Sequence, residues 1–426
     1  MNNICNDQVI NNEKLGLFYL ASLLIIYCLA IMSIFPPIRA LSFFNYIWPL
    51  LMTVWLLTSF LSSPAYFLKP SRHQLVGYIF FAYVIIIPHV SGNGFIGNRF
   101  LELFQILIFY WAYDINMKRG RQKYNERITL FLVPIVIVIC VNTILKLSSS
   151  LYASRLAKKD TMTGIELMSQ GVGGYEFIYF LVFVSASILY LILDKKTNLK
   201  AATKGGIGAL LILSLVTIVL SNFMLAFLLI IIMLLIRIFL PYLAIKLVIF
   251  NFFTLMIVVF FLPTIINFII SVSDQPMNIQ RLIELREFIS HGVIGLSSGA
   301  RLEAFQESVY GIFNNPLTGS VFTIMRSGTG DYSGFGQHSF LLDMFSIFGV
   351  IIGVIGLYVL FQPLIKLLNR SSMRKKISLP FLMLMLSGIF FLVNNLSPSI
   401  GFAIYFVYPT IYNFMLDKYR KNYLLV

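Results

Sequence analysis

The chain has 426 residues, of which 58% are hydrophobic and only 12% are charged, and its mean hydropathy is positive. This composition excludes an ordinary soluble domain and a disordered chain, and it indicates a membrane protein. The net charge of +15 is typical of a polytopic protein whose basic loops face anionic lipid. We therefore expect the basic residues to contact membrane lipids and not nucleic acid.

Apolar runs near the length of about 20 residues that a helix needs to cross a bilayer recur along the whole chain. They predict an all-α polytopic membrane protein with about 12 transmembrane helices, forming one integral membrane domain over 1–426. The first run is too long for a signal-peptide core, so we expect it to be retained. Ser221 and Asn222 alone separate two runs, which predicts a tight helical hairpin or a re-entrant pair. The runs are 15–35, 41–62, 75–90, 98–114, 127–147, 174–193, 205–220, 222–240, 245–271, 338–362, 380–396 and 399–416.

Lys and Arg are distributed unevenly between the connections. If the N-terminus is cytoplasmic, most of the 32 Lys and Arg residues fall on the cytoplasmic side, in loops 62–74, 115–127, 194–204 and 363–379 and beside the two termini. The positive-inside rule therefore predicts that both termini are cytoplasmic.

Two long outer loops, 148–173 and 272–337, oppose this bias because they also carry basic residues. Loops of this length are usually functional or disordered. In the second loop, segments 279–290 and 299–313 have apolar residues at helical spacing, which predicts order in the form of amphipathic helices. The basic residues of interest are Arg155, Lys158 and Lys159 in the first loop, and Arg281, Arg286, Arg301 and Arg326 in the second.

The helix predicted over 299–313 has one apolar stripe, with Arg301 and Glu303 on other sides of the helix. Such a helix either lies at the membrane interface with its apolar side down, or packs on the bundle with a solvated charged side. The stripe consists of Leu302, Phe305, Val309, Ile312 and Phe313. Asn-Pro-Leu-Thr-Gly at 315–319 ends the helix, a glycine-rich stretch follows, and His338 opens the next apolar helix, HSFLLDMFSIFGVIIG.

This order of motifs resembles the shared region of O-antigen polymerases and O-antigen ligases: an Arg-led amphipathic helix, N-P-L-x-G, a variable glycine-rich stretch and a His-led apolar helix. The hairpin around LSNFMLAF is also similar to the region before the large loop in that family, although Asn222 stands where the family usually has Arg. The resemblance covers about 60 residues. It implies metal-independent, inverting glycosyl transfer from undecaprenyl-pyrophosphate-linked oligosaccharide at the periplasmic face of a bacterial inner membrane.

The resemblance also implies roles for individual residues. Arg301 would stabilise the pyrophosphate leaving group through its bidentate fork, and His338 would accept the proton of the attacking sugar hydroxyl. Glu303, Glu307 and Asp343 are alternative bases. Binding of pyrophosphate or glycan would fall to Arg155, Lys158, Lys159, Arg281, Arg286, Arg326 and Gly319. No Asp-x-Asp motif and no cluster with metal-ligand spacing occurs in the sequence, so we expect neither a metal nor a cofactor.

Three other functions stay open. A ligase would use the same donor and transfer the glycan to lipid A core; the two charged outer loops favour the polymerase, with one loop for each lipid-linked substrate. A transporter or flippase would show duplicated halves or ionisable residues near the bilayer midplane, and the sequence has neither pattern. An inert scaffold would tolerate loss of Arg301 and His338. A chain-length regulator in the same membrane is a partner that the family alone implies.

Overall fold

The computed structural model is all-helical over the residues it describes, which are 16–158, 161–193, 199–239, 296–322, 339–370 and 379–423, with Asn267 and Ile283 between them. Every predicted apolar run within these residues lies in a helix. The run at 245–271 lies outside them apart from Asn267. The helices that contain the predicted runs are α1 (Leu17–Ile34), α3 (Phe44–Ser62), α5 (Arg72–Val90), α6 (Gly94–Lys118), α7 (Gln122–Ser149), α10 (Tyr175–Leu193), α11 (Ala201–Leu220), α12 (Met224–Phe239), α16 (Phe340–Arg370), α17 (Leu379–Val393), and the continuous α18 (Pro398–Phe402), η3 (Ala403–Val407) and α19 (Tyr408–Tyr423).

Seven of the described helices are long and apolar enough to cross a membrane, and three shorter apolar helices accompany them. The chain therefore has the architecture of a polytopic membrane protein, while the number of about 12 spans stays a prediction. The seven are α1, α5, α7, α10, α11, α16 and the α18–α19 helix.

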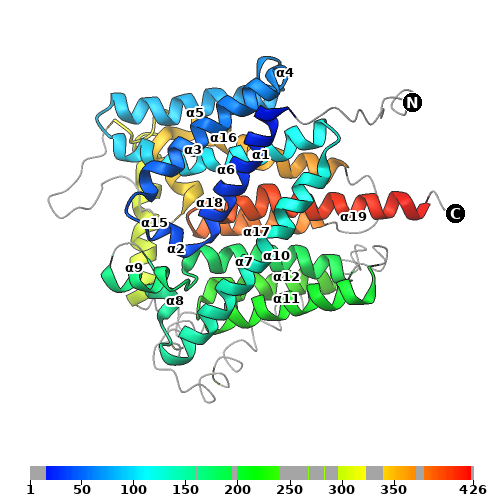
Figure 1. The fold of residues 1–426 in the computed structure, drawn as a ribbon. Helices are drawn as coiled ribbons and strands as arrows, with labels where there is room; N and C mark the ends of the chain where they lie inside the picture. Colours follow the sequence, from blue (N-terminus) through cyan, green and yellow to red (C-terminus); the bar gives the residue numbers. More distant parts are fainter. Residues whose placement is uncertain are drawn as a thin grey trace.

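The long helices pack side by side in one bundle, and α10 and the α18–α19 helix lie at its centre, where they are the most buried. The start of α1 and the end of α19 lie at the same end of the bundle, which we call the terminal end (Figure 1). The opposite end carries α2 (Pro36–Arg39), α8 (Ala153–Leu156), α9 (Met162–Ser169) and α15 (Leu296–Asn314). Because α15 runs across the ends of the long helices, we call this the α15 end.

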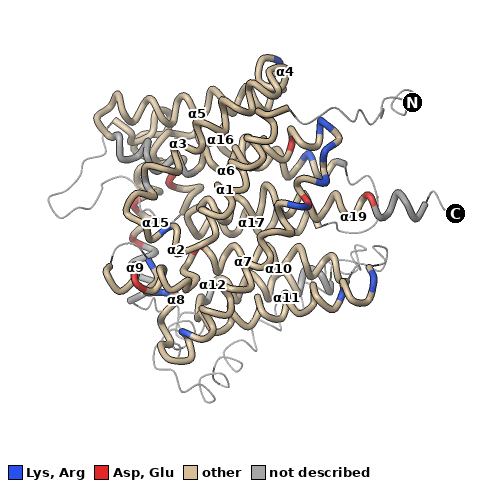
Figure 2. Tube along the Cα trace, viewed as in Figure 1, with Lys and Arg blue, Asp and Glu red and all other residues tan. Residues whose placement is uncertain are grey.

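Charged residues gather at the two ends of the bundle, and the middle is almost free of them among the residues drawn (Figure 2). Ionised side chains are costly in hydrocarbon, so a wide uncharged band between two charged ends is the distribution expected of helices that cross a bilayer.

The described residues of loop 148–173, the first predicted outer loop, are folded. They contain α8 and α9, and α9 packs against α2. A small apolar core separate from that of the bundle holds these residues together, and Ala40, which follows α2, packs against it; the core consists of Leu147, Ala153, Ala157, Leu167, Met168 and Val172. The loop is therefore a fixed part of the α15 end.

Candidate functional site

The helix α15 is joined to the first turns of α16 by a buried polar contact. The Ser308 hydroxyl donates to Oδ1 of Asp343 at 2.7 Å, and both residues are almost completely buried. Ser308 lies on a narrow side of α15 made of small residues, with Ala304 and Gly311 one turn away in either direction. Small residues at this spacing let two helices approach closely.

The predicted apolar stripe of α15 is divided between two environments. Val309 is 38% exposed and Phe313 is 79% exposed, whereas Phe305 and Ile312 are half-buried and Ser308 is buried. The closest contact with α16 uses small residues, and both alternatives for 299–313, an interfacial helix and a helix that packs on the bundle, stay predictions.

The turn after α15 docks on a break in α16. Gly349 interrupts α16 with φ 77° and ψ 172°, a conformation essentially confined to glycine. The unwound backbone there bonds to the incoming turn: the Val350 N–H donates to the Pro316 carbonyl at 2.8 Å, and the Val321 N–H donates to the Ile347 carbonyl at 3.0 Å. The backbone groups that lose their helical partners at the break form hydrogen bonds with the Asn-Pro-Leu-Thr-Gly turn and the residues after it. The glycine at 349 and the turn at 315–319 therefore serve the same contact.

Gly319 has a packing role in this contact. Its φ is +69°, and a Cβ atom there would lie 2.1 Å from the Ile347 carbonyl oxygen. A Cβ at Gly349 would lie 2.2 Å from the Leu317 carbonyl oxygen. Two glycines therefore let two backbones touch. This explains Gly319 without a ligand, and its predicted contact with the glycan stays a prediction.

Further polar contacts lie at the α15 end, and we call the residues that make them the polar belt: Ser308, Asp343, Asn394, Ser399, Glu176 and Arg39. The Phe340 N–H at the start of α16 donates to the Asn394 carbonyl at 3.2 Å, and the Ser399 hydroxyl in α18 donates to the Glu176 carbonyl at 3.2 Å. These contacts join α16 to the segment after α17, and α18 to the start of α10.

Arg39 of α2 and Glu176 of α10 form a bidentate ion pair in the polar belt. The Arg39 Nη1 and Nη2 atoms donate to the two carboxylate oxygens of Glu176 at 2.6 and 2.5 Å, and both side chains are about three-quarters buried. Sequence reasoning missed this pair because 137 residues separate its members. The available signal was a lone carboxylate in the first turn of α10 and a lone arginine in the first outer connection.

We expect the Arg39–Glu176 pair to stabilise the α15 end. A double-mutant cycle with Arg39→Ala and Glu176→Ala, read from thermal unfolding in detergent, should give a coupling free energy of about 1 kcal/mol, since the pair is forked and largely withdrawn from solvent. Additive effects of the two substitutions would show that the pair contributes nothing.

Arg155 lies against the hairpin between α11 and α12. Its Nη2 donates to the Asn222 carbonyl, its guanidinium lies over the Phe223 ring at 5.5 Å, and the neighbouring Ser154 hydroxyl is 3.2 Å from the hydroxyl of Ser221. The hairpin itself is confirmed as a tight turn, with Asn222 at φ 57°. The segment that contains α8 thus contacts the hairpin through Ser154 and Arg155.

The other predicted site residues are placed only in part. Arg301 lies in α15, seven residues before Ser308. Lys158 is exposed at the end of the segment containing α8. His338 immediately precedes Ser339, whose hydroxyl accepts from the Leu342 N–H at 3.2 Å as α16 begins. His338 itself lies outside the described residues, as do Lys159, Arg281, Arg286 and Arg326.

Of the alternative bases, Glu303 and Glu307 are exposed on α15, and Asp343 is buried under it. Of these three carboxylates, Asp343 is therefore the one that a hydrogen bond from Ser308 holds in position. Among the described residues, no three His, Cys, Asp or Glu side chains are grouped so that they could hold a metal ion. Metal independence stays a prediction.

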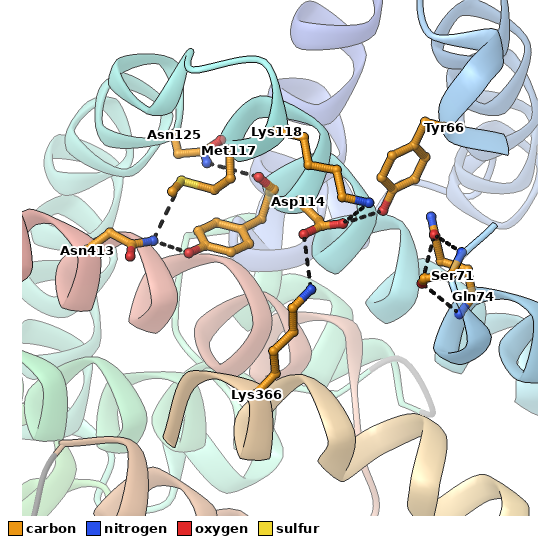
Figure 3. A network of polar contacts seen from close by, with 10 residues as sticks. Tyr66, Ser71, Gln74, Asp114, Met117, Lys118, Asn125, Lys366 and Asn413 are labelled. Atoms are coloured by element: carbon orange, nitrogen blue, oxygen red, sulfur yellow. Dashed lines mark hydrogen bonds and ion pairs between the residues drawn. The ribbon is translucent and has the colours of Figure 1, made fainter. Parts of the chain in front are cut away.

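A second polar cluster lies at the terminal end, centred on Asp114 near the end of α6 (Figure 3). Its carboxylate accepts from the Tyr66 hydroxyl at 3.0 Å and pairs with Lys118 at 3.2 Å and with Lys366 of α16 at 3.8 Å. Burial and the adjacent Asp114 raise the pKa of Tyr66 above its ordinary value, so Tyr66 keeps its proton and stays a donor. The cluster neutralises a buried carboxylate and joins α4 (Pro64–Leu68), α6 and α16.

Comparisons of the chain with protein-family models, with curated proteins and with solved structures find no match.

Proposed function

We propose that this protein is an O-antigen or polysaccharide polymerase, which joins oligosaccharide repeat units carried on undecaprenyl pyrophosphate at the periplasmic face of a bacterial inner membrane. One observation carries the proposal. The Arg-led helix α15 and the turn containing Asn315–Gly319 pack directly on the start of the His-led helix α16, through Ser308–Asp343 and the Gly349 break. Motifs that define the resemblance along the sequence thus meet at one end of the bundle.

In the proposed reaction, the acceptor sugar hydroxyl attacks the anomeric carbon of the donor glycan, a new C–O bond forms with inversion, and the bond to the pyrophosphate breaks. The hydroxyl proton passes to a base, for which we propose His338, and the lipid leaves as its pyrophosphate. Arg301 would stabilise the charge that develops on the leaving group, because the guanidinium fork matches phosphate oxygens. Arg281, Arg286, Arg326, Lys158 and Lys159 would attract and hold the anionic headgroup.

Arg155, a basic residue of the first outer loop, bears on the one departure from the family pattern. The family usually carries Arg in the hairpin where this chain has Asn222. The guanidinium of Arg155 reaches that same turn from the neighbouring loop. We propose that Arg155 supplies the positive charge that Asn222 does not.

The orientation follows from the charges. We propose that the terminal end is cytoplasmic, because its connections contain most of the basic residues, including Lys118, Arg119, Arg121 and Lys123 between α6 and α7. The α15 end would then be periplasmic. A chain-length regulator in the same membrane is a further proposed partner.

A transporter or flippase is the competing function from another class. Ionisable residues in the middle of transmembrane segments commonly mark transport pathways. Among the described residues, two aspartates are buried, Asp114 and Asp343. Asp114 lies only four residues from the end of α6 and is paired with two lysines, and Asp343 lies in the first turn of α16, where it accepts from Ser308. Neither lies in the middle of its helix. This arrangement favours a structural role and therefore the enzyme.

The experiment that tests the function is incubation of the purified protein in vesicles with lipid-linked repeat units as the sole glycan substrate, followed by gel analysis. We expect a ladder of glycan lengths. Transfer only after addition of lipid A core would identify a ligase, and an unchanged glycan under both conditions would contradict glycosyl transfer and favour the transporter.

A further inference from the structure

The helix α15 has two exposed sides of opposite character. Val309 and Phe313, four residues apart, are exposed on one side, while Glu303 and Glu307, also four residues apart, are exposed on the other. The side that includes Ser308 lies between them and packs on α16. A helix lying on the end of a soluble protein has no reason to keep its apolar stripe uncovered, since burial of that area would be favourable.

Exposed apolar side chains are also present in the turn after α15 and on the helix α16 that this turn contacts. Leu317 is 67% exposed in the turn that contacts Gly349, and the next residues of α16 include Ile351 and Val354, which are 57% and 53% exposed. Tyr358, seven residues after Ile351, is also exposed, so α16 presents an apolar stripe along its length. The helix α16 is one of the candidate membrane spans, and lipid acyl chains are the environment of such a stripe.

We infer that α15 is an interfacial helix whose Val309–Phe313 side, together with Leu317, lies in the acyl-chain region of the same bilayer leaflet that surrounds the start of α16. Its Glu303–Glu307 side faces water. The occupant of the apolar surface is therefore membrane lipid. This assignment agrees with the direction of α15, which crosses the ends of the membrane-spanning helices (Figure 1).

The placement fixes the level of the membrane surface at the Ser308–Asp343 contact, between the two exposed sides of α15. A polyprenyl chain lies among acyl chains, and its pyrophosphate lies at the membrane surface. In a consequence that rests on the proposed function, the polar belt is at the level where the pyrophosphate of a lipid-linked donor resides.

The test measures depth and does not depend on activity. In a background with Cys5, Cys28 and Cys140 replaced, single cysteines at positions 303, 307, 309 and 313 are labelled with a small fluorophore in reconstituted vesicles. Quenching by a lipid with a nitroxide on its acyl chain is compared with quenching by aqueous iodide. We expect Val309→Cys and Phe313→Cys labels to be quenched several-fold more by the nitroxide lipid than by iodide, and the Glu303→Cys and Glu307→Cys labels to show the reverse.

Glu307 is the matched control for Phe313, because both are exposed in the last two turns of α15 on different sides. Equal quenching at the four positions would overturn the inference. Protection of position 313 from both quenchers would also overturn it, by showing that protein covers this side; loss of that protection on dilution in lipid would identify the cover as a second copy of the chain. If the depth profile is as expected and no glycan ladder forms, the interfacial placement stands and the proposed function fails.

Discussion

The substitution Arg301→Ala is expected to reduce glycan chain growth by at least about 100-fold, the loss typical when one preorganised donor to a developing anion is removed. Arg301 lies in α15, the helix that is joined to α16 through Ser308 and Asp343. Arg301→Lys should retain only part of the activity, because an ammonium group is a point charge without the bidentate fork. Chain growth is measured as the initial rate of ladder formation with lipid-linked repeat units.

Glu303→Gln is the matched control, since Glu303 is exposed two residues further along the same helix. We expect wild-type rates for this variant and unchanged thermal unfolding for all three. A wild-type rate for Arg301→Ala would exclude Arg301 from the donor site, and the same comparison with His338→Ala tests the proposed base.

The substitution Gly349→Ala is expected to destabilise the α15 end, and to abolish activity because the turn after α15 can no longer dock on α16. The positive φ of Gly349 would cost an alanine about 1–3 kcal/mol. In addition, the new Cβ would overlap the Leu317 carbonyl oxygen, a backbone atom that cannot move without undoing the docked turn. We expect a lower midpoint of thermal unfolding and faster proteolysis at the turn after α15.

Gly388→Ala provides the control for Gly349→Ala. Gly388 lies in α17, and a Cβ there would meet nothing within 4 Å, so alanine should be neutral or slightly stabilising by helix propensity. If Gly349→Ala has the same midpoint of thermal unfolding and the same activity as Gly388→Ala, the contact between the turn and the α16 break does not hold the α15 end together.

Much of the fold could be predicted from the sequence, because lipid-crossing helices are defined by local composition. The runs at 15–35 and 174–193, for example, correspond closely to α1 and α10, and the Ser221-Asn222 interruption is a tight turn. The environment of the apolar side of α15 could not be decided from the sequence. A stripe of Val309 and Phe313 indicates burial, and periodicity alone cannot distinguish burial in protein from exposure to lipid.

The candidate site shows the same limit. The motifs that correspond to α15 and α16 follow one another along the sequence, but the contacts that hold the two helices together depend on residues with weak local signals, such as Ser308, Asp343 and Gly349. The Arg39–Glu176 pair depends on tertiary structure alone, because it joins segments far apart in sequence. Arg155 was selected for its charge, and its contact with the Asn222 turn could be found only from the packed hairpin.

The most direct test of glycosyl transfer is the release of undecaprenyl pyrophosphate during the reaction with lipid-linked repeat units, measured by mass spectrometry together with the number of new glycosidic bonds. Each bond formed by displacement of the pyrophosphate must free one lipid pyrophosphate, so we predict a ratio of one to one that holds while the ladder grows. Consumption of the lipid-linked units without release of lipid pyrophosphate, or release without new bonds, would contradict the proposed polymerase.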